Sequence, residues 1–332
     1  MSSGGVLRSL RAASVAASCT SSREPREVRV SIEVRPFWRS DREQLTTLVN
    51  AHVAAVIPGV SVSTNTVLSQ IEREPAEFIV DPWVTERTTL VAVERDRVVA
   101  AAHLRRYGTT EEVGEAYRDT GEIAWLLAWP DAPYWPDHGA GNELAARCVE
   151  QLRQWGVGRR YADGALPAPG VYGVPEQWPH IRSIYGSNGF VYDGHLEIVL
   201  LAVVDDIPPA PALQDGIVAR RRVGINGTRL SAYVGDDEVG FIEVDTELAR
   251  GSALSRYAGW ADVGNFEVAD AHRADEIRRW LIATAADWLR LGRIDRLLAY
   301  ADETEEELAT FLREIGFREI TRTQRGWIRR DG

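Results

Sequence analysis

One sequence pattern occurs twice in this chain, and it restricts the fold more than any other feature. In each copy an amphipathic helix is followed by a short apolar stretch with Tyr-Ala-Asp, and a later helix ends at Gly-Phe. The first copy has Tyr161-Ala162-Asp163 and Gly189-Phe190, and the second has Tyr300-Ala301-Asp302 and Gly316-Phe317. Recurrence of a whole order of elements indicates that one ancestral unit was duplicated. The sequence therefore predicts two tandem modules.

Chain length and a proline-rich segment predict the boundaries of these modules. A chain of 332 residues accommodates two units of about 150 residues each. Residues 205–211 carry three prolines among acidic and small residues, which is typical of a linker. We predict an N-terminal module at 28–204, a linker at 205–216 and a shorter, degenerate C-terminal module at 217–332. Residues 1–27 are rich in Ser, Ala and Arg, and we interpret them as a disordered tail rather than a signal peptide.

Charge and cysteine content restrict the partners. The formal net charge of −11 disfavours binding to nucleic acid or to an anionic membrane surface, because both need a concentrated cationic face. Cys19 and Cys148 stand in unrelated contexts, so they predict neither a disulfide framework nor a cysteine-based zinc site. No apolar run reaches the ~18 residues of a membrane-spanning helix. We expect a soluble cytoplasmic protein that uses no metal.

Hydrophobic periodicity predicts the elements of both modules. The first module reads as strand 28–34, helices 45–56 and 66–74, strands 89–93, 98–104 and 123–129, and helix 144–155. It continues with strand 161–163, a Pro/Gly-rich loop, a helix that Pro175 opens, and strands 190–192 and 196–204. The second module reads as strands 217–222, 228–234, 239–244 and 264–268 before a helix at 274–291. It has no counterpart of the two early helices.

This order of elements, with Gly-Phe after the last helix, resembles the GNAT superfamily of N-acetyltransferases over nearly the whole chain after residue 28. The resemblance implies an α/β (α+β) fold of two tandem GNAT-like modules, each with a mixed, mainly antiparallel central sheet flanked by helices. It also implies acetyl-CoA as the cosubstrate and an amine that attacks the thioester directly. In this family the strand before the central helix splays from its neighbour and holds the pantetheine arm.

The family binds the CoA pyrophosphate at a glycine-rich turn that opens the central helix. Unpaired N–H groups at a helix start stabilise a phosphate, and glycines let it approach closely. The resemblance assigns this role in the first module to the turn at His138, Gly139, Ala140, Gly141 and Asn142. It assigns the pantetheine contacts to Leu127 and Ala128 on the splayed strand.

The phosphate-binding turn of each module departs from the family pattern. Pro136 replaces the basic residue that leads the turn in the first module. In the second module Glu276 and Arg278 occupy the glycine positions, so that a carboxylate would face the pyrophosphate. We therefore expect the first module to be the active one.

Acyl transfer from a thioester needs a base, an oxyanion donor and an acid. Tyr185 stands four residues before Gly189, where the family places the acid that protonates the CoA thiolate, and the second module has Leu312 there. The alternative for Tyr185 is a core ring with its hydroxyl bonded to the backbone. Glu122 and Asp163, at strand ends beside the acceptor cleft, are candidate bases, and the alternative for both is a solvated surface carboxylate.

The acceptor is expected to be a primary amine of a small molecule or a peptide. A Pro/Gly-rich insertion at 167–175 would form a lip over the acceptor pocket, with Tyr172 and Trp178 as candidate lining residues. Two other functions stay open: a non-catalytic CoA-binding or scaffold protein, and activity in the second module with Arg273 on phosphate and Glu267 as base. The oligomeric state is open between a monomer and a homodimer.

Overall fold

The computed structural model describes residues 32–72, 83–130, 139–168, 170–211, 216–246, 248, 259–269 and 274–330. The first half contains β1 (Glu33–Pro36), η1 (Arg39–Asp41), α1 (Arg42–Val56), α2 (Thr64–Ile71), β2 (Val84–Glu94), β3 (Arg97–Tyr107), β4 (Thr120–Ala128), α3 (Gly139–Gln154), β5 (Arg159–Ala162), β6 (Val174–Pro175), α4 (Pro179–Ser187) and β7 (Phe190–Val203). The second half contains η2 (Val204–Asp206), β8 (Ile217–Gly224), β9 (Gly227–Val234), β10 (Asp237–Asp245), β11 (Trp260–Val268), α5 (Ala274–Leu291), β12 (Arg296–Asp302), α6 (Glu306–Glu314) and β13 (Arg318–Arg329). The predicted tail at 1–27 lies outside the described residues.

The strands form one continuous sheet in the order β1-β2-β3-β4-β5-β13-β7-β12-β11-β10-β9-β8. Neighbouring strands run antiparallel except for two pairs, β4 with β5 and β11 with β12, which run parallel. These two parallel pairs stand at matching places in the two modules. The predicted mixed, mainly antiparallel fold is therefore confirmed.

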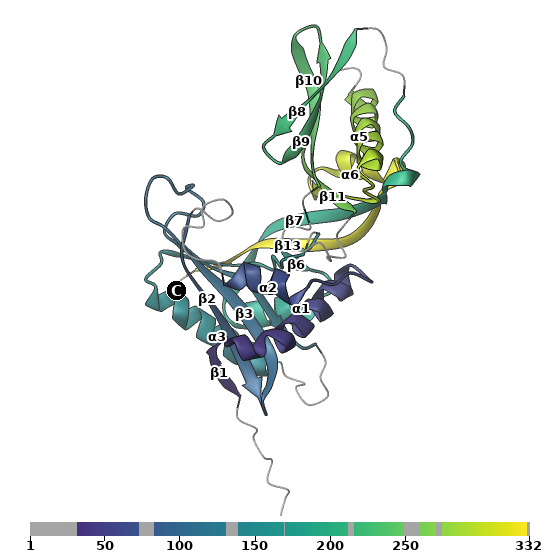
Figure 1. Ribbon diagram of the computed structural model, residues 1–332. Coiled ribbons are helices and arrows are strands. Elements are labelled where there is room, and N and C mark those ends of the chain that lie inside the picture. The colour runs from purple at the N-terminus through teal and green to yellow at the C-terminus, as the bar shows by residue number, and fades with distance from the viewer. Residues whose placement is uncertain are drawn as a thin grey trace, which may run out of the picture. The chain divides into compact units, whose positions relative to one another are not determined.

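The two modules exchange their final strands. β13, the last strand of the chain, lies between β5 and β7, and β7 lies between β13 and β12. In Figure 1 β7 and β13 run side by side. Each module thus completes its sheet with a strand from the other half of the sequence. The predicted boundaries at 204 and 217 stay a prediction, and the exchange shows that the sheet does not divide there.

Two hydrophobic cores lie on opposite faces of the shared strands. Neighbouring residues of a strand point to opposite faces, and in β12 Leu298 belongs to the first core whereas Leu297 belongs to the second. In β7 the same alternation places Val199 in the first core and Leu200 in the second. The central strands are therefore buried on both faces, and they form the wall between the two cores.

Most predicted elements are confirmed within a few residues, and the 274–291 helix matches α5 at both ends. Pro175 does not open a helix, because it lies in the short strand β6, and Pro179 occupies the first turn of α4 instead. The strands predicted at 190–192 and 196–204 form the single strand β7. No helix among the described residues is long and apolar enough to cross a membrane.

Candidate active site

β4 and β5 pair over only four residues and then separate. Their parallel register runs from Thr120 opposite Arg159 to Ile123 opposite Ala162. The last bridges are made by Asp163, whose N–H donates to the Ile123 carbonyl at 2.8 Å, and by Ala165, whose N–H donates to Ala124 at 3.0 Å. β4 continues to Ala128 beside β3 alone. This divergence is the splayed geometry that the sequence resemblance predicts for the first module.

The three predicted catalytic residues lie together at this splay. The Tyr185 hydroxyl donates to the Asp163 carbonyl oxygen at 2.7 Å, and the Tyr107 hydroxyl donates to Glu122 Oε2 at 2.7 Å. Burial and then the charge of Glu122 raise the pKa of Asp163 to about 7. The Asp163 carboxyl group therefore changes its ionisation near neutral pH, which suits a general base.

Tyr185 is fully buried, and burial, followed by the charge of Asp163, raises its pKa well above the usual value. Its hydroxyl thus stays protonated, as an acid requires. A Tyr185 that only packs in the core would show the same buried ring and the same hydrogen bond to a backbone carbonyl. Catalysis by Tyr185 therefore stays a prediction. A hydrogen bond with the Leu126 backbone opposes the pKa rise and places the hydroxyl beside the splayed strand.

The start of α3 is packed against α4. Gly139 is the first residue of α3, and Ala140 and Gly141 are buried. A Cβ on Gly141 would overlap Ile184 Cδ1, the end of a flexible side chain, and would lie 3.3 Å from the Ala128 Cβ, so α3 begins in close contact with α4 and β4 here. Asn142 Oδ1 accepts a hydrogen bond from Asn188 Nδ2 at 3.0 Å. His138 lies outside the described residues.

Two buried histidines, His52 and His180, cover the end of β4, and their contact is not predicted by the sequence. His180 Nε2 lies 3.1 Å from the Ala128 carbonyl oxygen and 3.2 Å from His52 Nε2. Burial lowers the pKa of His52 to about 4, so this imidazole is neutral. Trp178 is also buried here and donates its indole N–H to the His52 carbonyl, so it belongs to the core and not to the predicted lip. Ala128, at the end of β4, is therefore covered by α4.

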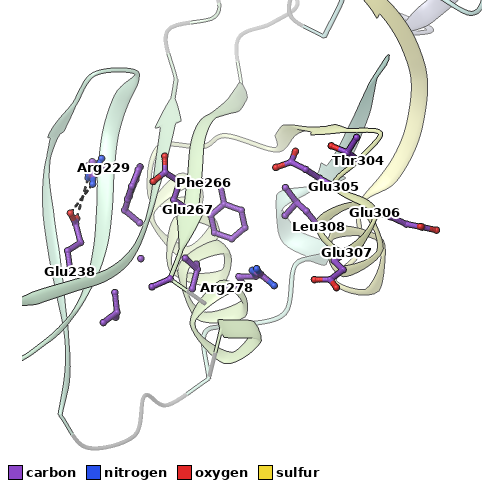
Figure 2. A pocket seen from close by; sticks show the side chains of 15 residues that line it. Arg229, Glu238, Phe266, Glu267, Arg278, Thr304, Glu305, Glu306, Glu307 and Leu308 are labelled. Atoms are coloured by element: carbon purple, nitrogen blue, oxygen red, sulfur yellow. Dashed lines mark hydrogen bonds and ion pairs between the residues drawn. The ribbon is translucent and has the colours of Figure 1, made fainter. Parts of the chain in front are cut away.

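The second module has an open cavity at the matching splay. β11 and β12 pair only from Trp260 to Asp262, and a cavity of about 810 Å³ lies beside the end of β11 (Figure 2). Its lining comes from β9, β10, β11, α5 and the start of α6, as the labelled side chains in Figure 2 show. Leu312, at the position of Tyr185, is buried in the second core. The C-terminal module, which has an open cavity at its splay, thus has no residue at this position that could act as the acid.

The charge of this cavity is unfavourable for an anion. Carboxylates dominate the charged lining, which consists of Arg229, Glu238, Glu267, Arg278, Glu305, Glu306 and Glu307. Arg278 is engaged by Asp275 at 3.0 Å, and Arg229 by Glu238 at 2.9 Å. The predicted base Glu267 does line the cavity, whereas Arg273 lies outside the described residues. The electrostatic field here disfavours a CoA pyrophosphate.

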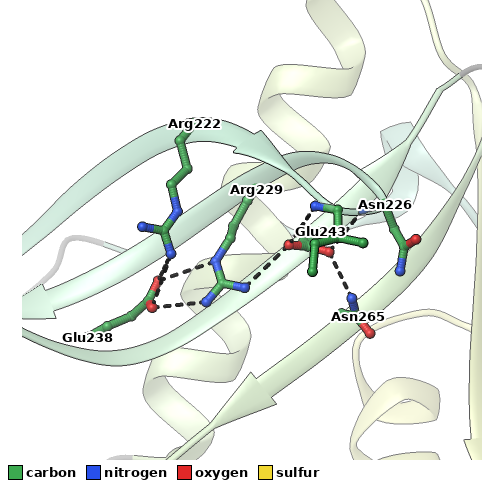
Figure 3. Close-up of polar contacts among 7 residues, drawn as sticks. Arg222, Asn226, Arg229, Glu238, Glu243 and Asn265 are labelled. Carbon is green, nitrogen blue, oxygen red and sulfur yellow. Dashed lines mark hydrogen bonds and ion pairs between the residues drawn. The ribbon is translucent and has the colours of Figure 1, made fainter. Parts of the chain in front are cut away.

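Arg229 belongs to a buried polar network on the same sheet (Figure 3). Glu243 is only 1% exposed, and it accepts hydrogen bonds from Asn265 Nδ2 at 2.8 Å and from the Asn226 N–H at 3.2 Å. Burial alone would raise its pKa, but these hydrogen bonds and the one from Arg229 hold the pKa below its usual range. The network holds β8, β9, β10 and β11 together and leaves Arg229 little freedom to bind a ligand.

Comparisons with known proteins agree with this architecture. No protein-family model matches the chain, and no curated protein matches it in sequence. A tandem GNAT protein from the clavulanic acid biosynthesis pathway is similar over 90% of this chain and 98% of its own, with a TM-score of 0.63 and 15% identity. A GCN5-related N-acetyltransferase from Sphaerobacter thermophilus is similar over 90% and 94%, with a TM-score of 0.61 and 15% identity.

A third likeness is to the glucosamine N-acetyltransferase region of a fungal multi-domain GH3 β-N-acetylglucosaminidase. It covers 91% of this chain with a TM-score of 0.61 and 14% identity, but only 39% of that longer protein. At these identities the likenesses show the fold. The chain has the fold of the tandem GNAT N-acetyltransferases.

Proposed function

We propose that this protein is an acyl-CoA-dependent N-acyltransferase that transfers an acetyl group from acetyl-CoA to a primary amine in its N-terminal module. The observation that carries the proposal is the meeting of Asp163, Glu122 and Tyr185 at the β4–β5 splay. A carboxyl group with a pKa near neutrality and a protonated hydroxyl at one place are what direct acyl transfer needs.

In the proposed reaction the Asp163 carboxylate accepts a proton from the acceptor ammonium group. The neutral amine then attacks the thioester carbon, so a C–N bond forms and the C–S bond breaks. A backbone N–H between Leu126 and Ala128 would hold the carbonyl oxygen while it carries negative charge. Tyr185 would give its proton to the departing thiolate, and the second proton of the attacking nitrogen would return to the Tyr185 oxygen, which leaves the amide, the free thiol and a protonated Asp163.

Acetyl-CoA would need at least one rearrangement to bind in the first module. The N–H groups at the start of α3, from Gly139 to Asn142, would face the pyrophosphate, as helix N-termini do for anions. The pantetheine arm would run along Leu127 and Ala128, where His180 now bonds the Ala128 carbonyl. His180 therefore has to leave this position before acetyl-CoA can bind.

Release of free thiol from acetyl-CoA, followed with a thiol reagent over a panel of primary amines, tests this function. We expect amine-dependent release by the wild type and a loss of about a hundredfold in Tyr185→Phe. The conservative Leu312→Met change at the matching position of the second module should leave the rate unchanged. Absence of amine-dependent release from the whole panel would contradict the proposal and favour a non-catalytic protein.

The open cavity of about 810 Å³ supports a second candidate, in which the C-terminal module carries the activity with Glu267 as base. Under this alternative Glu267→Gln would abolish thiol release and Asp163→Asn would not. We rank it second because the cavity has a carboxylate-rich lining and because Leu312 cannot donate a proton.

A further inference from the structure

The last strand of the sheet, β8, has an exposed edge. β8 pairs with β9 alone, in an unbroken register from Ile217 opposite Val234 to Gly224 opposite Gly227. All six residues at 218–223 are exposed. A strand at the edge of a sheet offers a row of backbone N–H and C=O groups that no neighbouring strand uses. β8 can therefore accept one further strand.

The opposite edge of the sheet, at β1, is protected against such pairing. β1 has only four residues and ends at Pro36, which has no N–H to give to a further strand. Short edge strands and proline are common means by which proteins keep an edge from pairing. β8 has eight residues, no proline and no bulge. The two edges of one sheet thus differ in their capacity to bind another chain.

Apolar side chains gather on the hairpin that β8 forms with β9. In this module β9 follows β8 after a two-residue turn, in place of the two helices that follow β1. Val218, Val223 and Ile225 are 53%, 92% and 91% exposed. Three large apolar side chains on one hairpin favour a contact surface over a strand that only faces water.

The buried polar network holds this hairpin in place. Glu243 accepts hydrogen bonds from the Ile225 N–H at 3.3 Å and from the Asn226 N–H at 3.2 Å, so it fixes the turn. Arg222 on β8 binds Glu238 at 3.2 Å, as Figure 3 shows. An edge that is already ordered loses less conformational entropy when it binds a partner.

The charge of β8 is opposite to that of the whole chain. Arg220, Arg221 and Arg222 are consecutive, although the formal net charge is −11. Neighbouring residues of a strand point to opposite faces, so both faces of this edge carry a guanidinium group. Arg222 is paired with Glu238, whereas Arg220 and Arg221 form no ion pair within the described part of the chain. A bound segment with carboxylates would supply the missing partners.

Other occupants fit this edge less well. Antiparallel pairing of β8 with β8 of a second copy, about the strand centre, would place arginines directly opposite arginines, and like charges in that position are destabilising. A nucleic acid or an anionic membrane would be repelled by the net charge of −11, and both need a larger cationic face than this strand. A short acidic segment carries too few charges for that repulsion to dominate.

We propose that β8 is a docking edge that binds an extended acidic segment of a partner protein as one further strand of the sheet. Backbone hydrogen bonds along β8 supply the affinity, and the side chains of β8 supply the specificity. Arg220 and Arg221 pair with carboxylates, and Val218 and Val223 contact apolar side chains. At about 3.3 Å per residue a segment of about eight residues covers the strand. This inference is independent of acyl transfer.

Fluorescence anisotropy with a labelled eight-residue peptide of alternating glutamate and valine tests the docking edge. The matched probe is the same peptide with lysine in place of glutamate. We expect the glutamate peptide to bind at least about tenfold more tightly. Arg221→Glu should weaken its binding by about tenfold, whereas Arg318→Glu, which changes an exposed arginine on β13, should leave binding unchanged.

Methylation of the peptide nitrogens separates strand addition from attraction by charge alone. N-methyl groups on all valines, or on all glutamates, remove alternate N–H groups and leave the charge of the peptide unchanged. Alternate N–H groups of a strand face the same neighbour, so one of these two peptides should bind at least about tenfold more weakly than the unmethylated peptide. Full binding by both methylated peptides would overturn strand addition.

The other outcomes are equally decisive. No binding of the glutamate peptide, equal binding of the lysine peptide, or binding that Arg221→Glu leaves unchanged would overturn the docking edge. A dimer of the free protein in sedimentation velocity that the glutamate peptide dissociates would assign the edge to a second copy and would overturn the proposal as well. Thermal denaturation shows whether each variant is folded, and Arg220→Glu provides a second test if Arg221→Glu is not.

Discussion

Both modules contain a parallel strand pair that diverges after a few residues, but different side chains surround the two gaps. In the N-terminal module the gap beyond Ala124 holds Asp163 and Tyr185, and His180 from α4 closes its far end. In the C-terminal module the gap beyond Asp262 is an open cavity of about 810 Å³ with a carboxylate-rich lining. The parallel strand pair therefore produces a gap in both copies, and the side chains decide what that gap can do. One splay thus holds the candidate catalytic side chains, and the other holds an open cavity.

The largest expected effect concerns the exchanged strands. A fragment that ends at residue 211 lacks β13, so β5 and β7 lose the strand between them and the first core loses Trp327. We expect this fragment to be insoluble or unfolded, as judged by circular dichroism. Co-expression with residues 212–332 should restore a folded complex. A stable, soluble fragment 28–211 would show that the N-terminal module is independent of the second.

Asp163→Asn tests the assignment of the chemistry to the first module. We expect kcat/KM for thiol release to fall about a hundredfold, because an amide cannot accept the proton of the ammonium group. Asp302→Asn changes the same residue of the repeated Tyr-Ala-Asp pattern in the second module and should leave kcat/KM within about twofold. Equal losses of kcat/KM in Asp163→Asn and Asp302→Asn would contradict the assignment of activity to the N-terminal splay.

The pH dependence of kcat/KM tests whether Asp163 in the N-terminal splay is the base. Because the pKa of Asp163 is raised to about 7, its carboxylate forms as the pH rises through that value, so kcat/KM should increase from pH 6 to pH 8. The folded-state pKa lies above the unfolded one, so ionisation of Asp163 also removes stability as the pH rises from about 4 to 7. In Asp163→Asn the pH dependence of kcat/KM, measured as a rate profile, and the pH dependence of stability, measured by thermal denaturation, should both be smaller. A wild-type profile that falls over this range would contradict Asp163 as base.

His180→Ala has the smallest expected effect and probes how the first gap opens. Because His180 occupies the proposed pantetheine path, its removal should tighten acetyl-CoA binding by up to about tenfold. It should also lower the free energy of unfolding by about 1–3 kcal/mol, because the Ala128 carbonyl and His52 lose a buried partner. Calorimetry and denaturant unfolding measure the two effects. Weaker acetyl-CoA binding in a folded variant would place His180 among the binding residues instead.

Short-range patterns in the sequence predicted the local structure well, whereas the splay was implied by the resemblance to the GNAT superfamily. The apolar spacing of 274–291 indicated α5, and the Tyr-Ala-Asp pattern placed Asp163 at the end of a strand, where the structure has β5. The contact of Asp163 with Tyr185 comes from the structure alone. Periodicity carries no information on which strand pairs with which, so the exchange of β7 and β13 was not predictable. The contact between His52 and His180 joins residues 128 positions apart and has no local signal.

The pocket of about 350 Å³ that Tyr172, Asp245 and Asp262 line shows the same limit. Asp245 and Asp262 lie just outside the predicted strands 239–244 and 264–268, and Tyr172 lies in a loop of the other module. Antiparallel pairing of β10 with β11 places Asp245 opposite Asp262. Long-range strand pairing, not composition, thus creates this polar pocket.

Calorimetric titration of acetyl-CoA into the wild type, Gly139→Glu and Glu276→Gly tests the central claim most directly. A carboxylate at the start of α3 repels the pyrophosphate, whereas removal of Glu276 at the start of α5 should matter little if the second module does not bind the cofactor. We predict one binding site in the wild type, its loss in Gly139→Glu and its retention in Glu276→Gly. No binding to the wild type, or a site that Gly139→Glu leaves intact, would contradict this account.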